Sequence, residues 1–449
     1  MGSEWSPGQL SEIAEIIMGQ SPSGDTCNSK GIGKPLLNGP TEFGSHHPVP
    51  AQFTTDPKKV AVSGDILFCV RGSTTGRMNW ADQQYAIGRG IAAIRHNGGH
   101  EYQSFLRGII ENRLPLLLAS ATGSTFPNVS RNQLLELEID IPPLPEQRAI
   151  AHILGSLDDK IELNRQMNET LEAMAQALFK SWFIDFDPVI DNALAAGHPI
   201  PEELQARAAL RESLGDALKP LPDDLRNLFP GEFEFTQEMG WIPKGWEVKT
   251  VGEVLSVVGG GTPSTSEPSY WEHGTHLFCT PKDMSSLVSP ILIDTERKLT
   301  KKGVTKISSG LLPIGTVLLS SRAPIGYLAI TDEPMTINQG IIAMLGNAHF
   351  SSLYVKCWTG ENIDKILSRA NGSTFLEISK KNFRPIPFVV PTPEIVDIFD
   401  RHSREFHTRL ISCTRNIAEL TQLRDTLLPK LLSGEIRIPE AEKLVEATK

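Results

Sequence analysis

The pattern of apolar and polar positions occurs twice along this 449-residue chain. Short apolar runs bounded by glycine and polar turns predict buried strands, and a helical stretch and a last alternating strand follow them in each copy. These segments are 65–70, 90–94, 102–112 and 137–141 in the first copy, and 316–320, 340–345, 352–367 and 386–390 in the second. The pattern therefore predicts an α+β protein with two similar mixed α/β domains, the first head (residues 1–145) and the second head (residues 241–393).

Matching residues support a duplication. Ala121–Phe126 returns as Ala370–Phe375, and Gly88–Ile94 matches Asn338–Met344 at a nearly constant offset. Each copy is far longer than a solenoid repeat, so a duplicated domain is the better interpretation. Because Thr125-Phe126 and Thr374-Phe375 recur in both heads, we interpret them as framework residues.

A Pro-x-Pro-Glu motif closes each head, at Pro143–Glu146 and Pro391–Glu394. Proline ahead of an acidic first turn is typical of a helix start. Apolar residues then recur at alternating steps of four and three, which predicts a narrow coiled-coil seam. The seam positions are Ile150, Leu154, Leu157, Ile161, Leu171, Ala175, Leu178 and Trp182 in the first helix, and Phe399, Phe406, Leu410, Cys413, Ile417, Leu420, Leu427 and Leu431 in the second.

We therefore expect two long antiparallel helices (146–184 and 394–436) that separate the heads with approximate two-fold symmetry. At 1.5 Å per residue each would span about 50 Å. The alternative is that each helix packs only on its own head. Asn164 and Asn168 interrupt the first seam, and either they are buried and fix its register or they face solvent at a kink.

The charge of the chain is unevenly distributed. The formal net charge is −10, yet residues 151–240 alone carry 7 Lys and Arg against 17 Asp and Glu, so both heads are nearly neutral. A high-affinity polyanion binder acting alone is disfavoured, although a local basic face on each head is compatible with these numbers. We expect residues 185–240 to be an acidic linker or docking segment with a short helix near 201–218 and partly packed aromatics, and residues 437–449 to be a C-terminal tail.

Motifs for independent chemistry are missing from the sequence. The five cysteines are dispersed, without the spacing of a zinc site or a disulfide framework, and no phosphate-binding loop, Gly-x-Ser-x-Gly or methyltransferase motif occurs. No secretory signal and no long apolar run is present, so we expect a cytoplasmic protein that does not cross a membrane. The sequence predicts no catalytic residue and no metal site.

At this point the chain resembles the specificity (S) subunits of type I restriction–modification systems. The resemblance is carried by the duplicated heads, the two Pro-x-Pro-Glu helix starts, Leu178–Pro188, Gly245-Trp246 and Leu428–Ile436. It implies a non-catalytic subunit with two target recognition domains, each reading one half of an asymmetric double-stranded DNA site. It also implies that two methyltransferase subunits and restriction (motor) subunits dock on the chain, and that these partners supply S-adenosylmethionine binding and the use of ATP and Mg²⁺.

The chemistry of base and phosphate recognition suggests which side chains contact DNA. Arginine pairs bidentately with guanine, lysine suits phosphate, and serine and threonine adapt to several partners. On glycine-rich loops these are Arg71, Ser73, Thr74, Arg77 and Arg89 in the first head, and Lys282, Ser321, Arg322 and Lys381 in the second. A different class of function, a non-catalytic adaptor whose paired heads bind proteins, remains as the alternative.

Overall fold

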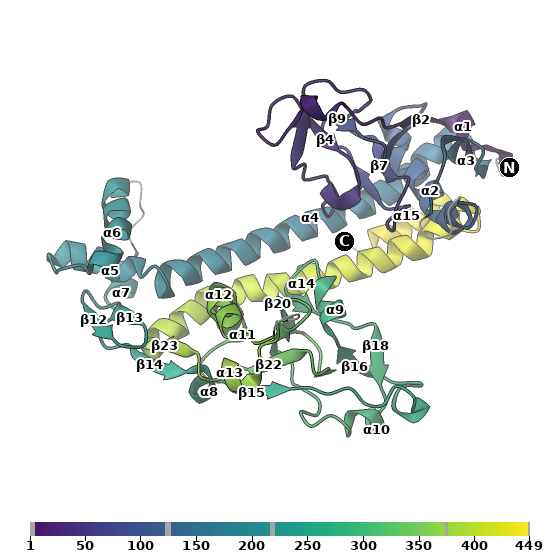
Figure 1. Cartoon of the computed structure of the whole chain (residues 1–449). Coiled ribbons are helices and arrows are strands. Elements are labelled where there is room, and N and C mark those ends of the chain that lie inside the picture. The colour runs from purple at the N-terminus through teal and green to yellow at the C-terminus, as the bar shows by residue number, and fades with distance from the viewer. Residues whose placement is uncertain (1–4, 122–126, 216–220, 348, 373–375, 448–449) are drawn as a thin grey trace. The chain divides into compact units, whose positions relative to one another are not determined.

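The computed structural model describes residues 5–121, 127–215, 221–347, 349–372 and 376–447 (Figure 1). The chain forms two compact units, one made of Met1–Leu163 with Ile417–Lys449 and the other of Asn164–Asn416. Each unit contains one head and half of each long helix, α4 (Leu144–Phe183) and α14 (Pro393–Leu432). The repeated Thr125-Phe126 and Thr374-Phe375 lie outside the described residues.

The first head is built on three sheets. A four-stranded sheet has the order β2-β10-β7-β8, a five-stranded sheet has the order β3-β5-β4-β9-β6, and β1 pairs with β11. The predicted strands at 65–70, 90–94 and 137–141 are confirmed as β7, β10 and β11. Its elements are β1 (Ser6–Gln9), α1 (Leu10–Ile13), β2 (Ala14–Met18), η1 (Gly24–Thr26), β3 (Cys27–Asn28), β4 (Lys34–Leu37), η2 (Pro40–Glu42), β5 (Gln52–Thr54), β6 (Val60–Ala61), β7 (Ile66–Cys69), β8 (Met78–Trp80), β9 (Tyr85–Ile87), β10 (Ile91–His96), η3 (His100–Tyr102), α2 (Gln103–Ala119), α3 (Arg131–Leu135) and β11 (Glu138–Ile141).

The second head repeats this topology. A five-stranded sheet has the order β15-β22-β19-β20-β17, a three-stranded sheet has the order β18-β16-β21, and β14 pairs with β23. The predicted strands at 316–320, 340–345 and 386–390 are confirmed as β19, β22 and β23, and the predicted helix at 352–367 is divided into α11 and α12. Its elements are β14 (Glu247–Thr250), α8 (Val251–Val254), β15 (Ser256–Gly259), η5 (Pro268–Tyr270), β16 (His276–Cys279), α9 (Pro281–Ser285), β17 (Ile291–Leu292), β18 (Arg297–Leu299), α10 (Lys301–Val304), β19 (Val317–Ser321), β20 (Ile325–Thr331), β21 (Met335–Ile337), β22 (Ile341–Leu345), α11 (Ser352–Glu361), α12 (Ile363–Ser368), α13 (Lys380–Phe383) and β23 (Pro387–Val390).

The two heads also share a close backbone crossing. A Cβ atom on Gly19 would lie 2.1 Å from the oxygen of Gly88, and one on Gly260 would lie 1.9 Å from the oxygen of Ile337. Only glycine fits where one backbone passes so near another. The crossing is therefore part of the duplicated framework.

The long helices run antiparallel, as their contacts inside each unit show (Figure 1). In the first unit Ile150, early in α4, shares a core with Leu431, late in α14. In the second unit Phe179, late in α4, packs edge-on against Phe399, early in α14, with ring centroids 5.8 Å apart.

The same helices also pack on the heads. The core of the first unit joins Ile150 and Leu431 to Phe105 of α2, and that of the second joins Phe179 and Phe399 to Tyr354 of α11. The paired-helix interpretation and its alternative are thus both partly right. Each long helix buries a face that is wider than a coiled-coil seam, so it can pack against the other long helix and against a head at the same time.

The structure distinguishes the two asparagines that interrupt the apolar seam of α4. Asn168 is buried and its Nδ2 donates to Thr414 Oγ1 at 3.2 Å, whereas Asn164 is only half-buried. The prediction of Cys413 as a seam residue is wrong, because Cys413 is half-buried and Thr414 beside it is buried. A helix with 3.6 residues per turn drifts against a 3.5-residue repeat, so the buried position moves by one.

The expected linker at 185–240 is more ordered than a linker. It contains α5 (Asp187–Ala196), α6 (Glu202–Leu214) and α7 (Asp223–Arg226), followed by the hairpin β12 (Phe233–Thr236) and β13 (Gly240–Pro243). Phe229 is buried, but Phe235 is 62% exposed. The expected partial packing of the aromatic residues is confirmed, because Phe229 is buried and the exposed Phe235 packs edge-on against Trp241 with ring centroids 5.5 Å apart.

An ion-paired clasp holds α5 and α6 together. Arg207 donates to both carboxylate oxygens of Asp187, at 2.7 and 2.8 Å. Burial alone would raise the pKa of Asp187, but hydrogen bonds from Arg207 and Ser181 and the charge of Arg211 lower it overall. Some acidic side chains of this segment are thus paired with arginines of the same segment.

The expected C-terminal tail is also corrected. Residues Ile438–Glu446 form helix α15, whose Ala441 and Val445 are buried in the core of the first unit. In the sequence this is a short, charged stretch. Only its packing on the core of the first unit shows that Ala441 and Val445 form an apolar face.

Candidate nucleic-acid interface

Four loops of the first head converge at one edge of its sheets. Gln20 N, after β2, donates to Ile87 O at 2.8 Å, and Gly88 N, after β9, donates to Leu37 O at the end of β4, also at 2.8 Å. Val70 N, at the end of β7, donates to Gly90 O at 2.9 Å. We call residues 19–23, 38–42, 71–76 and 88–90 the convergent loops of the first head.

The second head builds the same arrangement with equivalent bonds. Gly261 N donates to Ile337 O at 3.1 Å, Asn338 N donates to Cys279 O at 3.0 Å, and Ser321 N donates to Gly340 O at 2.8 Å. Its convergent loops are residues 260–264, 280–285, 322–324 and 338–340. The duplication has therefore preserved a backbone scaffold on which the side chains differ.

In the first head the structure brings all five predicted residues to these loops or their margins. Arg71, Ser73, Thr74, Arg77 and Arg89 are all exposed. Arg77, which ends the loop at β8, donates to Pro40 O and Phe43 O at 3.3 and 2.9 Å, so its guanidinium also fixes the neighbouring loop. Among the described residues no carboxylate forms an ion pair with Arg71, Arg77 or Arg89, which leaves these charges available to an anion.

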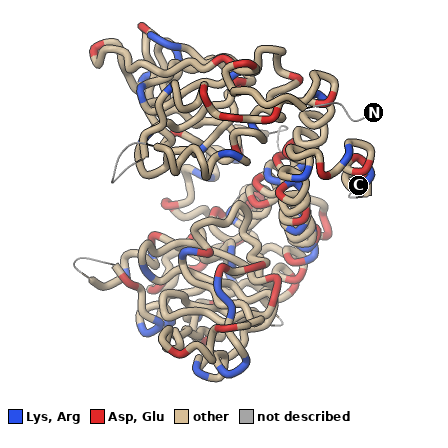
Figure 2. Tube along the Cα trace, turned by 90° about the vertical axis from the view of Figure 1, so that its right-hand side faces the viewer, with Lys and Arg blue, Asp and Glu red and all other residues tan. Residues whose placement is uncertain are grey.

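In the second head two of the three predicted cations form ion pairs. Lys282 Nζ donates to Glu296 Oε2 at 2.6 Å, and this hydrogen bond and the charge of Glu296 raise the pKa of Lys282. Arg322 Nη1 lies 3.8 Å from Glu377 Oε2. Lys381 is exposed on α13, which packs on β15 rather than forming part of the loops. The two heads thus offer different charge at equivalent places. Figure 2 shows Lys and Arg in blue and Asp and Glu in red along the described trace.

The prediction of Ser321 as a DNA contact is wrong. Its side chain is 2% exposed, at the end of β19. The bond from Ser321 N to Gly340 O is equivalent to the bond from Val70 N to Gly90 O, so Ser321 occupies the place of buried Val70. The next residue, the half-buried Arg322, is the counterpart of Arg71.

Sequence reasoning missed polar residues on the other two loops. Thr262 Oγ1 donates to Gln339 Oε1 at 2.5 Å, and in the first head Arg89 N donates to Ser21 Oγ at 3.4 Å. In the first head the pair joins the loop after β2 to the loop before β10. In the second head the pair joins the loop after β15 to the loop before β22. The repeat of Ser21-Pro22-Ser23 as Thr262-Pro263-Ser264 was the available signal.

The chemistry of these loops suits recognition more than catalysis. Arginine, glutamine, threonine and serine side chains carry donors and acceptors that read base edges, and backbone amides and cations contact phosphates. The cysteine at the loop margin, Cys279, is buried, and burial raises the pKa of its thiol. It therefore stays protonated, and no activated nucleophile is supplied at this point.

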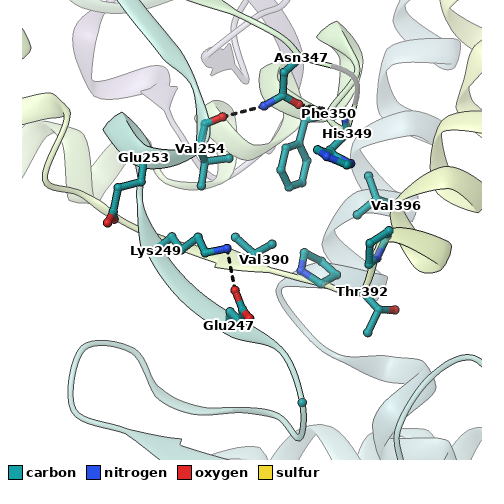
Figure 3. A pocket seen from close by; sticks show the side chains of 13 residues that line it. Glu247, Lys249, Glu253, Val254, Asn347, His349, Phe350, Val390, Thr392 and Val396 are labelled. Atoms are coloured by element: carbon teal, nitrogen blue, oxygen red, sulfur yellow. Dashed lines mark hydrogen bonds and ion pairs between the residues drawn. The ribbon is translucent and has the colours of Figure 1, made fainter.

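A separate pocket of about 390 Å³ lies in the second unit between β14, the start of α14 and the residues Asn347, His349 and Phe350 (Figure 3). Lys249 is paired with Glu247 at 2.7 Å, and Asn347 Nδ2 donates to Val254 O at 2.8 Å. Its lining includes one histidine and neither serine nor cysteine. The polar groups shown in Figure 3 mainly satisfy one another, which favours a structural role.

Comparison with known proteins identifies the class. The family of the type I restriction modification DNA specificity domain matches the chain twice, over residues 2–173 and 243–413. The chain belongs to this family and carries its domain in duplicate. It is a non-catalytic DNA-recognition subunit of a type I restriction–modification system.

Relatives of known name agree. The chain is 30% identical to the type I restriction enzyme HindI specificity subunit of Haemophilus influenzae over 84% of this chain and 88% of that protein. It is 37% identical to the MjaIX specificity subunit of Methanocaldococcus jannaschii over 37% of this chain and 39% of that protein. The crystal structure of an S subunit from M. genitalium has the same fold, with a TM-score of 0.53, 17% identity and 96% of each chain covered.

One further property concerns the helices. Among the residues that the structure describes, none belongs to a helix long and apolar enough to span a lipid bilayer.

Proposed function

We propose that this subunit recognises a bipartite, asymmetric site in double-stranded DNA, with the convergent loops of each head reading one half. The observation that carries the proposal is the repeated backbone scaffold of the loops together with their different side chains. A shared scaffold places both heads against DNA in the same way, and different side chains let each read a different sequence.

We further propose that the long helices space the two half-sites and dock two methyltransferase subunits, and that restriction (motor) subunits join this complex. The partners would supply S-adenosylmethionine binding, adenine-N6 methylation and ATP- and Mg²⁺-dependent cleavage, since the resemblance to the family implies these activities for the complex. Shared phosphate contacts from the partners would explain how nearly neutral heads suffice for binding.

A head exchange tests this function. Residues 5–140 would be replaced by the first head of another specificity subunit, and modified adenines would be mapped in cells that express either protein with its partners. We expect one half of the recognised site to change while the other half and the gap stay as they were. Alteration of both halves would contradict independent reading, and a complex without sequence-dependent DNA retention would favour the adaptor alternative.

A further inference from the structure

The most basic stretch of the chain lies outside the convergent loops. Residues 297–306 contain five Lys and Arg and no Asp or Glu, and no other ten-residue stretch of this net-acidic chain contains five cations. They form β18, α10 and the turn that follows α10 in the second head. The charged residues of this stretch are Arg297, Lys298, Lys301, Lys302 and Lys306.

Four of these cations are exposed and unpaired. Lys298 is bound to Asp294 at 3.1 Å, but among the described residues no carboxylate lies within ion-pair distance of the other four. The charge of Lys302 acts on the nearby Glu267, but that carboxylate accepts a hydrogen bond from Ser269 and forms no ion pair with Lys302 among the described residues. Four exposed cations that lack an ion-paired carboxylate among the described residues repel one another, and an anionic partner would relieve this repulsion.

Aromatic rings hold these cations in place. The Arg297 guanidinium carbon lies 3.6 Å from the ring centroid of Trp271, and Lys302 Nζ and Lys306 Nζ lie 5.4 and 5.8 Å from the ring centroid of Tyr270. Lys302 Nζ also donates to Ser269 Oγ at 2.8 Å.

The rings are themselves anchored. Trp271 Nε1 donates to Ser264 O at 2.9 Å, and its ring packs edge-on against Phe278 at 5.2 Å. Long side chains positioned in this way lose less conformational freedom when they bind, which favours a built surface over a merely solvated one.

The patch adjoins the convergent loops. Arg297 pairs with Phe278 in β16, and Glu296 N donates to Asp283 Oδ1 of α9 at 2.8 Å.

We infer that Arg297, Lys301, Lys302 and Lys306 form a phosphate-binding patch that grips the DNA backbone beside the half-site read by the second head. This inference rests on the proposed function. Lysines bind phosphate as point charges and carry little base information, so the patch adds affinity and salt dependence and leaves the recognised sequence unchanged.

The first head has a weaker counterpart. The segment after β5 corresponds to the segment after β18, and it holds Lys58 and Lys59 with Asp56, which is paired with Lys58 at 2.5 Å. The second head therefore supplies more of the sequence-independent attraction, whereas the first head has its unpaired arginines on the convergent loops.

The test uses the complex of the chain with its partner subunits and the double variant K302Q/K306Q. Binding to a duplex with the recognised site and to an unrelated duplex would be titrated across salt concentrations. We expect the slope of log K against log salt to become shallower by about 2 on both duplexes, since each phosphate contact contributes about 0.9. The methylated sequence should be unchanged.

The matched control is K244Q/K249Q, which removes the same charge from exposed lysines that are paired with Glu232 and Glu247. The proposed patch would be contradicted if the slope of log K against log salt in K302Q/K306Q equalled the wild-type slope. It would also be contradicted if K244Q/K249Q changed the slope by the same amount. Loss of partner assembly with an unchanged slope would show that the patch binds protein. If the wild-type complex failed to distinguish the two duplexes, the proposed function would fail, while the slope on the unrelated duplex would still decide on the patch.

Discussion

The two heads share a backbone and differ in how their charges are used. In the first head Arg71 and Arg89 lie on the convergent loops without an ion-pair partner among the described residues, whereas in the second head Lys282 and Arg322 are bound to Glu296 and Glu377. Arg297, Lys301 and Lys302, which have no ion-pair partner among the described residues of the second head, lie to one side of its loops, on β18 and α10. Duplication thus preserves where the loops meet, and divergence decides which loop positions are free to bind an anion.

The largest effect should come from the shared framework. G19A and G260A each place a Cβ about 2 Å from a backbone oxygen, and we expect each to destabilise its own unit by about 2–3 kcal/mol. Hydrogen exchange read separately over the two units would measure this. The controls are G24A and G261A, where a Cβ meets no atom within 4 Å. Equal effects of variants and controls would show that the crossing is not part of the common framework.

A smaller effect should separate the heads at equivalent arginines. R71A should weaken DNA binding by the complex by about 1–3 kcal/mol, since an unpaired arginine at a base or phosphate is lost. R322A should weaken it less, because Arg322 first has to leave Glu377. Titration of the complex on its recognised duplex measures both.

The variant E377Q sharpens the same comparison, because it releases Arg322 and should strengthen binding. Weakened binding in E377Q would mean that the ion pair holds Arg322 in its productive place, which is the opposite of the role inferred from its pairing.

The smallest effect concerns a feature of the second unit alone, the clasp of α5 and α6. The pKa of Asp187 is lowered in the folded protein, so its contribution to stability is present above the ordinary carboxylate range and is lost as the pH falls through the folded pKa. D187N should destabilise the second unit by about 1–2 kcal/mol at pH 7, a value reduced because Arg207 is partly exposed.

The difference between D187N and the natural protein should begin to shrink as the pH falls through the ordinary carboxylate range near about 4, and it should vanish only below the lowered folded-state pKa of Asp187, where the carboxylate is protonated in both states. Urea unfolding of the second unit at pH 7 and pH 3 would measure it. The matched variant is D191N, whose carboxylate is 34% exposed and should matter less. A difference that is independent of pH would exclude the ion pair as its source.

Much of this architecture could be predicted from local patterns in the sequence. Runs such as 65–70 and 316–320 are apolar and bounded by glycine, so they are strands in any fold that buries them, and Pro-x-Pro-Glu begins both long helices within one or two residues of the predicted starts. The duplication could be recognised from the sequence because both copies keep the glycines and apolar residues that the same backbone requires.

What the sequence could not decide depended on contacts between distant segments. Ser321 looked like a loop residue until its bond to Gly340 placed it inside the sheet, and Arg322 and Glu377 became partners only when a strand end met a segment some 55 residues later. Residues 438–446 became a packed helix because the first unit offers a surface that covers Ala441 and Val445. Side-chain burial and ion pairing are properties of neighbours in space, which the order of residues along the chain does not contain.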